Sequence, residues 1–287
     1  MATIMYLAVA FVLGRGSVVF VEIAAATTFT FMNGCQNELW VGIQANAGIP
    51  LLAEGGFALA PGNKSSVVAE AGWGGRFWGR TGCVFDAHGI GSCQTGDCGG
   101  VLKCAGAGGA PPASLAEFTL NAANGDDFYD VSLVDGYNMA IRITPSGGKG
   151  ACGVPGCTSN LNTHCPAALQ VMSATGSVVA CKSACAAFGT PQYCCTDAYG
   201  SPTTCLPTPY SKVFKSACPT AYSYAYDDAS STFTCTGANY QISFCTACGF
   251  HVGCLVFILS QSFASFLCCL WPTLTMSVVT YVVIYAV

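Results

Sequence analysis

The segment from Gly89 to Cys104, with the sequence GIGSCQTGDCGGVLKC, constrains the fold more than any other part of this chain. Its three cysteines, at positions 93, 98 and 104, are separated by glycines, and large apolar side chains are scarce. Because packing cannot fix such a segment, glycines must permit its tight turns and cysteines must hold them. Zinc would need tetrads of cysteine or histidine, but the chain has only 3 histidines, and they are scattered. We therefore expect disulfides, and no metal or other cofactor.

The cysteine content and the charge limit where the protein works and what it binds. The chain has 287 residues and 20 cysteines, a level typical of an oxidising compartment, because cytosolic thiols are kept reduced. Only 8% of the residues are charged, and the formal net charge is -4. A mildly acidic chain argues against nucleic acid or an anionic membrane as an electrostatic partner. We expect a secreted, extracellular protein that is monomeric.

Both ends of the chain are apolar. Residues 1–26 end in three alanines, which suits signal peptidase, so we interpret them as a signal peptide. A membrane anchor is the alternative, because Arg15 interrupts the apolar run. Residues 246–287 form an apolar extension without Asp, Glu, Lys or Arg. Three hypotheses stay open for it: a membrane anchor, a GPI-attachment signal, or an artefact of the gene model.

Between these ends, short runs of alternating apolar and polar residues are rich in Thr, Phe and Val. Glycine and proline separate the runs, as in residues 55–64 (GGFALAPGNK), which we interpret as a turn with an N-glycosylation sequon at Asn63. Residues 221–226 (AYSYAY) and 231–245 continue the strand pattern. Several short strands at this spacing predict a mainly β fold, a β-sandwich.

Residues 156–219 have a different character, with many cysteines among loop residues. Two segments there have helical spacing. One is 178–189 (VVACKSACAAFG), which ends in a glycine, and the other is 210–218 (YSKVFKSAC), which is followed by a proline. The sequence therefore predicts a cysteine-rich region of short helices and loops.

The pattern Gly-x-Gly-x-Cys-x-Thr-Gly-Asp-Cys-x-Gly-x-x-Cys, which Gly89 to Cys104 fill, resembles the signature of the thaumatin-like proteins, the osmotin and pathogenesis-related group of plants. The resemblance extends from Thr27 to Cys245. It includes GRFWGRTGCVFD from Gly75, PPASLAEFTLN from Pro111, DFYDVSLVDGYN from Asp127, QYCC from Gln192 and STFTC from Ser231.

This resemblance implies a layout of three parts within 27–245. The first is a flattened antiparallel β-sandwich, made of residues 27–80, 114–155 and 220–245. The second is a small disulfide-stapled loop domain, 81–113, and the third is a disulfide-rich helical and loop domain, 156–219.

The resemblance also implies which cysteines pair. Four of the 20 cysteines (Cys248, Cys254, Cys268 and Cys269) lie in the extension and receive no partner, which leaves sixteen. An even number fits a disulfide framework, but the sequence alone leaves the connectivity open. The family pattern, transferred by order, implies Cys35–Cys245, Cys83–Cys93, Cys98–Cys104, Cys152–Cys235, Cys157–Cys218, Cys165–Cys181, Cys185–Cys194 and Cys195–Cys205.

Charged residues are rare, so their positions are informative. Arg76, Glu117, Asp130, Asp135 and Asp227 match the set that lines the acidic cleft of antifungal family members. For the last of these the match is open, because a second aspartate follows it directly. The resemblance implies that this cleft binds β-1,3-glucan or another fungal cell-wall polysaccharide.

Three functions stay open. The first is a secreted plant defence protein that binds glucan without cutting it. The second is a weak endo-β-1,3-glucanase, with Glu117 as the acid and Asp130 or Asp135 as its partner. The third is a structural or inhibitory disulfide scaffold, in which the carboxylates only pair with Arg76 and cap turns.

Aromatic residues near these positions divide into two groups. We expect Phe128 and Tyr129 to lie near the cleft, where their rings would stack on sugars. Tyr222, Tyr224 and Tyr226 alternate at strand spacing, which favours packing in the core or on a sheet face.

Overall fold

The computed structural model describes residues 10–13, 17–20 and 26–245. Strands β1 (Ala10–Leu13) and β2 (Ser17–Phe20) pair antiparallel with each other. The rest of the expected signal peptide and the whole extension 246–287 lie outside the described residues, so both interpretations stay predictions. In the described part of the chain, no helix has the length and apolar character needed to cross a membrane.

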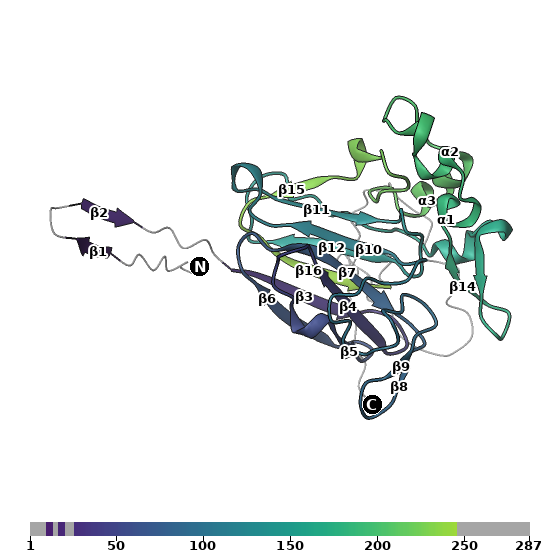
Figure 1. The fold of residues 1–287 in the computed structure, drawn as a ribbon, viewed down its shortest axis with the longest axis horizontal. Coiled ribbons are helices and arrows are strands. Elements are labelled where there is room, and N and C mark those ends of the chain that lie inside the picture. Colours follow the sequence, from purple (N-terminus) through teal and green to yellow (C-terminus); the bar gives the residue numbers. More distant parts are fainter. Residues whose placement is uncertain (1–9, 14–16, 21–25, 246–287) are drawn as a thin grey trace, which may run out of the picture. The chain divides into compact units, whose positions relative to one another are not determined.

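Two sheets form the body of the protein, as expected for a mainly β fold (Figure 1). The six-stranded sheet has the order β15 (Phe233–Cys235), β11 (Asp127–Ser132), β10 (Leu115–Thr119), β7 (Gly74–Arg80), β4 (Leu39–Ala45) and β5 (Gly56–Leu59). The four-stranded sheet has the order β12 (Ile141–Ser146), β16 (Asn239–Phe244), β3 (Thr27–Asn33) and β6 (Lys64–Ala69). Neighbouring strands pair antiparallel in both sheets, except that β16 and β3 pair parallel.

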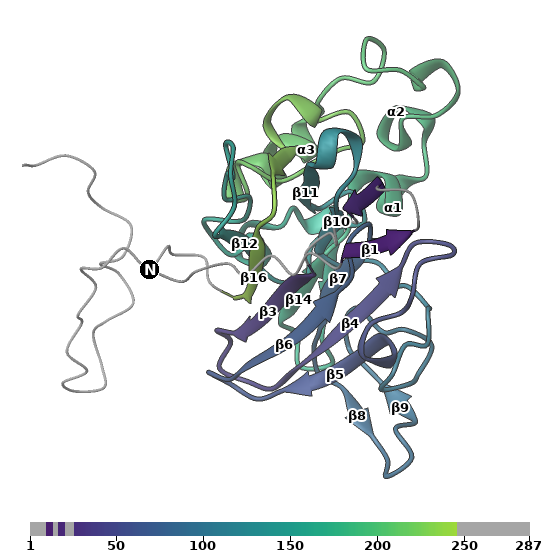
Figure 2. The ribbon, with the colours of Figure 1, turned by 90° about the vertical axis from the view of Figure 1, so that its left-hand side faces the viewer.

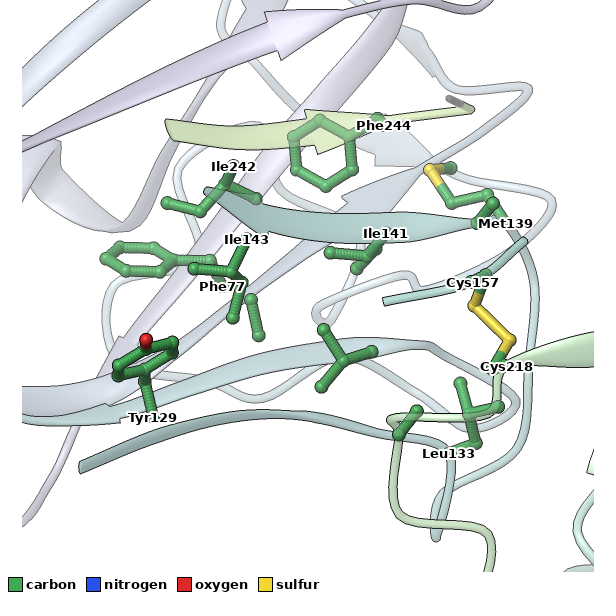
Figure 3. Close-up of a cluster of buried hydrophobic side chains, with 14 of the residues drawn as sticks. Phe77, Tyr129, Leu133, Met139, Ile141, Ile143, Cys157, Cys218, Ile242 and Phe244 are labelled. Atoms are coloured by element: carbon green, nitrogen blue, oxygen red, sulfur yellow. A yellow bond between two sulfur atoms is a disulfide. The ribbon is translucent and has the colours of Figure 1, made fainter. Parts of the chain in front are cut away.

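An aromatic core joins the two sheets. Phe29 on β3 lies edge-to-face with Phe77 on β7 and with Phe118 on β10, with 4.8 Å between ring centroids in each pair. Burial alternates along β3, so every second side chain points into this core. Figure 3 shows part of it, where side chains of β7, β11, β12 and β16 meet. The inner face of the six-stranded sheet is therefore mostly apolar, with the buried carboxylate of Asp127 hydrogen-bonded to the Tyr240 hydroxyl.

The small loop domain covers part of the outer face of the same sheet. Its hairpin consists of β8 (Val84–Phe85) and β9 (Gly91–Ser92). A second buried cluster contains Trp78 of β7 and the cysteines Cys98 and Cys104. The indole lies flat over Gly42 of β4, where a Cβ atom would come within 2.2 Å of the ring. The carboxylate of Asp97 accepts three backbone N–H bonds, so this residue stabilises the turn of the cysteine-glycine segment.

Short helices gather in the cysteine-rich part, far from β8 and β9 in both ribbon views (Figures 1 and 2). The structure contains α1 (Ala184–Phe188), α2 (Pro191–Cys194) and α3 (Pro209–Ala217), the strands β13 (Gln170–Met172) and β14 (Val178–Cys181), and the 3-10 helices η1 (Ala53–Gly55), η2 (Ala123–Gly125), η3 (Leu161–His164), η4 (Ala167–Leu169), η5 (Asp197–Tyr199) and η6 (Asp228–Ser230). Helix α3 confirms the prediction for 210–218; Thr208 and Ser211 form its capping box.

Three local predictions were wrong. The helix expected over 178–189 begins only at Ala184, because the β-branched start of the segment forms β14 and pairs with β13. Residues 55–64 are more than a turn, since they contain β5. Residues 221–226 form no strand; their one sheet-like contact is a bridge between Tyr222 and Ser132. Asn63 does lie exposed in the turn between β5 and β6.

Among residues 26–245 there are eight disulfides, and each joins two cysteines that the resemblance pairs. Cys35–Cys245 joins residues that are 210 positions apart in the sequence. It lies at the ends of β3 and β16, which are paired in the sheet. The first and last strands of the sandwich are therefore held together both by hydrogen bonds and by a covalent bond.

Candidate functional site

Three of the predicted residues lie in one row across the outer face of the six-stranded sheet. Glu117 on β10 is directly opposite Arg76 on β7 and directly opposite Asp130 on β11. Their neighbours Phe118 and Tyr129 point into the core, so the charged side chains must point to the other face. Directly opposed side chains on adjacent strands have Cβ atoms about 4.5–5.5 Å apart. We call these three residues the acidic row.

Arg76 neutralises only part of the negative charge of the acidic row. Arg76 Nε lies 3.5 Å from Glu117 Oε1, and the two side chains are 38% and 31% exposed. An ion pair with this much solvent access contributes about 0–1 kcal/mol to stability. The pair is therefore too weak to be the reason for placing two carboxylates side by side.

Burial and nearby like charges raise the pKa of both carboxyls. For Glu117 the main cause is burial; the charge of Asp135 raises the pKa further, and Arg76 opposes both effects. For Asp130, burial and the charge of Glu117 raise the pKa to about 8 against the opposing effect of Arg76. Asp130 Oδ1 is buried and has no hydrogen-bond partner among the described residues. The two carboxyls of the row therefore retain a proton to higher pH than exposed carboxyls do.

The predicted residue Asp135 lies beside the row, beyond the end of β11. It lines a small cavity of about 170 Å³, together with Pro111, Tyr193 and Tyr224. Its charge acts on Glu117. The residues of the acidic row do not line this cavity, which opens among the cysteine-rich part and the loop after β11.

The structure separates the two adjacent aspartates that the sequence could not distinguish. Asp227 accepts hydrogen bonds from the backbone N–H and the hydroxyl of Ser223. It also forms an ion pair with Lys215, with 2.9 Å between Nζ and Oδ2, and its side chain is only 14% exposed. Asp228 accepts a hydrogen bond from the Tyr222 hydroxyl at 2.9 Å, and its charge raises the pKa of Asp130. Asp227 therefore fixes the loop, whereas Asp228 is the aspartate that acts on the row.

Comparison with known proteins identifies the family. Residues 33–246 match the model of the thaumatin family. The chain belongs to this family. A pathogenesis-related thaumatin-like protein 3.5 of Cryptomeria japonica is 62% identical over 223 residues, which are 77% of this chain and 91% of that protein. A protein of Prunus avium named glucan endo-1,3-beta-glucosidase is 51% identical over 224 residues, again 77% of this chain and 91% of that protein. Among solved structures, the thaumatin-like xylanase inhibitor TLXI matches with a TM-score of 0.42 and 24% identity, over 76% of this chain and 98% of that one.

In this thaumatin family member, the two aromatic residues expected beside the site lie on opposite faces of β11. Phe128 shares the outer face with Asp130 and is 37% exposed. Tyr129 is 1% exposed and stacks on Phe118 in the core, where its hydroxyl donates to Gly153 O at 2.7 Å. The expectation that Tyr129 contacts sugar is wrong, because successive residues of a strand point to opposite faces.

Sequence reasoning missed two polar residues near the row and left a third undecided. Gln44 on β4 is directly opposite Arg76 and continues the row onto a fourth strand; only the strand register could have revealed it. Tyr222 is half-buried, and its hydroxyl contacts Asp228 and Thr232, so it does not simply pack on a sheet face. Asp228 was visible in the sequence only as the second of two aspartates.

Proposed function

We propose that the protein is a secreted plant defence protein that binds β-1,3-glucan of fungal cell walls on the acidic row. The observation that carries this proposal is the alignment of Arg76, Glu117 and Asp130 on one open face of a disulfide-braced sheet. Relatives named pathogenesis-related proteins, and one named a glucan endo-1,3-beta-glucosidase, support it.

The chemistry of the row suits the hydroxyl groups of a sugar chain. Arg76 and protonated Asp130 donate hydrogen bonds, and the carboxyl oxygens of Glu117 accept them, while each sugar hydroxyl can do both. Adjacent strands are about 4.8 Å apart, so the three side chains span about 10 Å. Phe128 lies on the same face and offers an apolar surface to a sugar ring. This arrangement recognises an uncharged, extended polysaccharide.

Weak hydrolysis is a second candidate, and the elevated pKa of Asp130 favours it. A glycosidase needs one carboxylic acid that stays protonated and a second carboxylate that is ionised. The sequence suggested Glu117 as the acid. The pKa of Asp130, about 8, instead supports Asp130 as the proton donor to the glycosidic oxygen. Glu117, next to Arg76, is then the base or nucleophile.

The variant Glu117→Gln tests the proposal. It keeps the side-chain volume and one acceptor but removes the charge. Loss of a hydrogen bond to a charged group should weaken laminarin binding by about 1.5–3 kcal/mol, roughly ten- to a hundredfold. Glu70→Gln is the matched control, because Glu70 is exposed and lies outside the row. Calorimetry on both variants measures the affinity.

The laminarin affinity decides between binding and a purely structural role. If Glu117 only pairs with Arg76, the variant will bind laminarin as tightly as the wild type, with at most a small change in melting temperature, and the proposal fails. Asp130→Asn adds the test of hydrolysis. Turnover that falls at least about a hundredfold with intact binding assigns the enzyme function.

A further inference from the structure

A second concave site lies away from the acidic row, at the end of the sandwich where its three parts meet. It is a cavity of about 550 Å³, and none of the residues of the acidic row lines it. We call it the amide cavity. Its described lining comes from all three parts, with Glu38 and Trp40 from the sandwich, Gln94 from the small loop domain, and Asn160 and Val179 from the cysteine-rich part.

The amide cavity is polar but almost uncharged. Glu38 is its one charged residue among those described, and no lysine, arginine or histidine is among them. Five of the lining residues are asparagine or glutamine. An anionic ligand would find no cation there, and a purely apolar ligand would leave the amides without partners.

Several of these amides are available to a ligand. Neither Gln94 nor Asn37 has a side-chain hydrogen bond to another described residue, and both are exposed at the rim. Asn160 uses its Oδ1 atom to accept from Tyr137 Oη at 3.2 Å and from the backbone of Asn162 at 3.1 Å. Its amide nitrogen is left to donate. A primary amide both donates and accepts, which matches a hydroxyl group.

The walls of the amide cavity are rigid. Asn162 donates to Asn138 O at 3.0 Å and to Val179 O at 3.2 Å, which joins the cysteine-rich part to the sandwich. The disulfide Cys35–Cys245 lines the cavity itself. Met139, which also lines the cavity, is buried and lies in the hydrophobic core near Ile141 and Phe244 (Figure 3). Because the site is already formed, little conformational entropy is lost when a ligand enters.

We propose that the amide cavity binds a neutral carbohydrate of about two sugar units, independently of the acidic row. The volume lies within the usual range of about 300–1,000 Å³ for ligand sites. The half-buried indole of Trp40 supplies an apolar surface for a sugar ring, and the rim amides supply hydrogen bonds to its hydroxyls. Uncharged amides beside an aromatic wall distinguish this site from the carboxylate-based row.

The test is a titration of the full-length secreted protein with laminaribiose, and separately with cellobiose, followed by NMR. The background is the double variant Glu117→Gln, Asp130→Asn, so that any binding at the row is already weakened. We expect chemical-shift changes at the Trp40 indole N–H and at the side-chain amide of Gln94. If neither disaccharide shifts these signals, the inference is overturned.

Three variants in the same background assign the site. Val179→Phe fills the cavity and should abolish the shifts, whereas Val84→Phe is the matched control, because Val84 is 76% exposed and lies outside the cavity. Asn160→Asp keeps the acceptor for Tyr137 but removes the free donor, and should weaken binding about threefold to tenfold. If Val179→Phe binds as tightly as its control, the inference is overturned.

Laminarin binding by Val179→Phe in the otherwise native protein separates the two proposals. Unchanged laminarin affinity with lost disaccharide shifts supports two independent sites. If the wild type does not bind laminarin but laminaribiose still shifts the cavity signals, the proposed function fails and this inference stands.

Discussion

Arg76 and Arg80 lie on the same strand and point to the same face, yet their surroundings have nothing in common. The guanidinium of Arg80 is fully buried under the small loop domain, where it donates to the carbonyl oxygens of Val101 at 2.9 Å and Leu102 at 2.6 Å. It also donates to Val41 O at 3.3 Å. Arg76, four residues earlier, is half-exposed and contacts one carboxylate.

The difference shows that the burial and the hydrogen bonds of each arginine depend on whether the small loop domain covers it, and not on the strand that carries it. Where the loop domain covers the sheet, its carbonyl groups satisfy the arginine, and burial lowers the pKa of Arg80 to about 10 without removing its charge at neutral pH. Where the sheet is open, Arg76 has donors to spare, and the neighbouring carboxyls Glu117 and Asp130 keep raised pKa values. One half of the face is therefore structural, and the other half is available to a ligand.

The largest effect should come from removing the buried arginine. Arg80→Met leaves the carbonyl oxygens of Val101 and Leu102 buried without donors, at about 1–3 kcal/mol each, so we expect a total loss of about 3–5 kcal/mol. Arg76→Met should lower the free energy of unfolding by less than about 1 kcal/mol. Urea denaturation of both variants measures this. Equal losses of unfolding free energy in the two variants would contradict the distinction between a structural Arg80 and an available Arg76.

The adjacent aspartates provide the same comparison on a smaller scale. Asp227→Asn breaks a mostly buried pair with Lys215 and should lower stability by about 2–3 kcal/mol. Asp228→Asn should change stability by less than about 0.5 kcal/mol, because Asp228 is exposed. It should instead lower the pKa of Asp130, since the charge of Asp228 raises it. Thermal denaturation with carboxyl NMR titration checks both; the reverse order of stabilities would contradict the assignment.

The open half of the face should also make stability depend on pH. Asp130 has a pKa of about 8 in the folded protein, against about 3.9 for an unfolded aspartate. Between these values the folded protein binds the extra proton, so the free energy of unfolding falls as pH rises, by at most about 1.4 kcal/mol per unit. Asp130→Asn should remove this part of the slope. Urea denaturation at several pH values measures how the free energy of unfolding depends on pH. Asp197→Asn is the control, because Asp197 is exposed. An equal pH dependence in both variants would refute the raised pKa of Asp130.

Arg76→Met should change the free energy of unfolding little but should leave a clear electrostatic signature on the acidic row. The charge of Arg76 lowers the pKa of Glu117 and of Asp130, so both values should rise when it is removed. Arg76→Lys keeps the charge and should restore most of the difference. NMR titration of the carboxyl carbons distinguishes the variants. Unchanged pKa values in Arg76→Met would show that the arginine does not act on the row.

Much of this architecture could be predicted because short-range signals agree with the fold. The segment Gly89 to Cys104 identifies the family by its cysteine spacing, and family order implies the disulfides that the structure contains. Alternation along β10 and β11 also brings Glu117 and Asp130 to one face. The same alternation, applied to Tyr129, would have placed that side chain in the core.

The errors occurred where a segment's partner decides its structure. Residues 178–181 are extended because β13 pairs with them, and that partner is not visible in local spacing. Residues 221–226 alternate like a strand but have no strand beside them apart from the bridge at Ser132. Asp227 and Asp228 differ only through Lys215 and Tyr222, which contact them in space.

The parallel pairing of β3 with β16 has a consequence for the order of folding. The partner of the first strand of the sandwich is encoded at residues 239–244, so the ribosome must deliver nearly the whole described body before this sheet can be completed. Contacts between such distant segments require closure of a long loop and slow the search for the native state. During synthesis β3 can pair with β6 as soon as residues 64–69 are made, but its other edge stays unpaired until residues 239–244 follow. An unpaired strand edge of this kind makes a partly folded chain prone to aggregation, so the nascent protein carries this exposed edge until the last strand of its body is made.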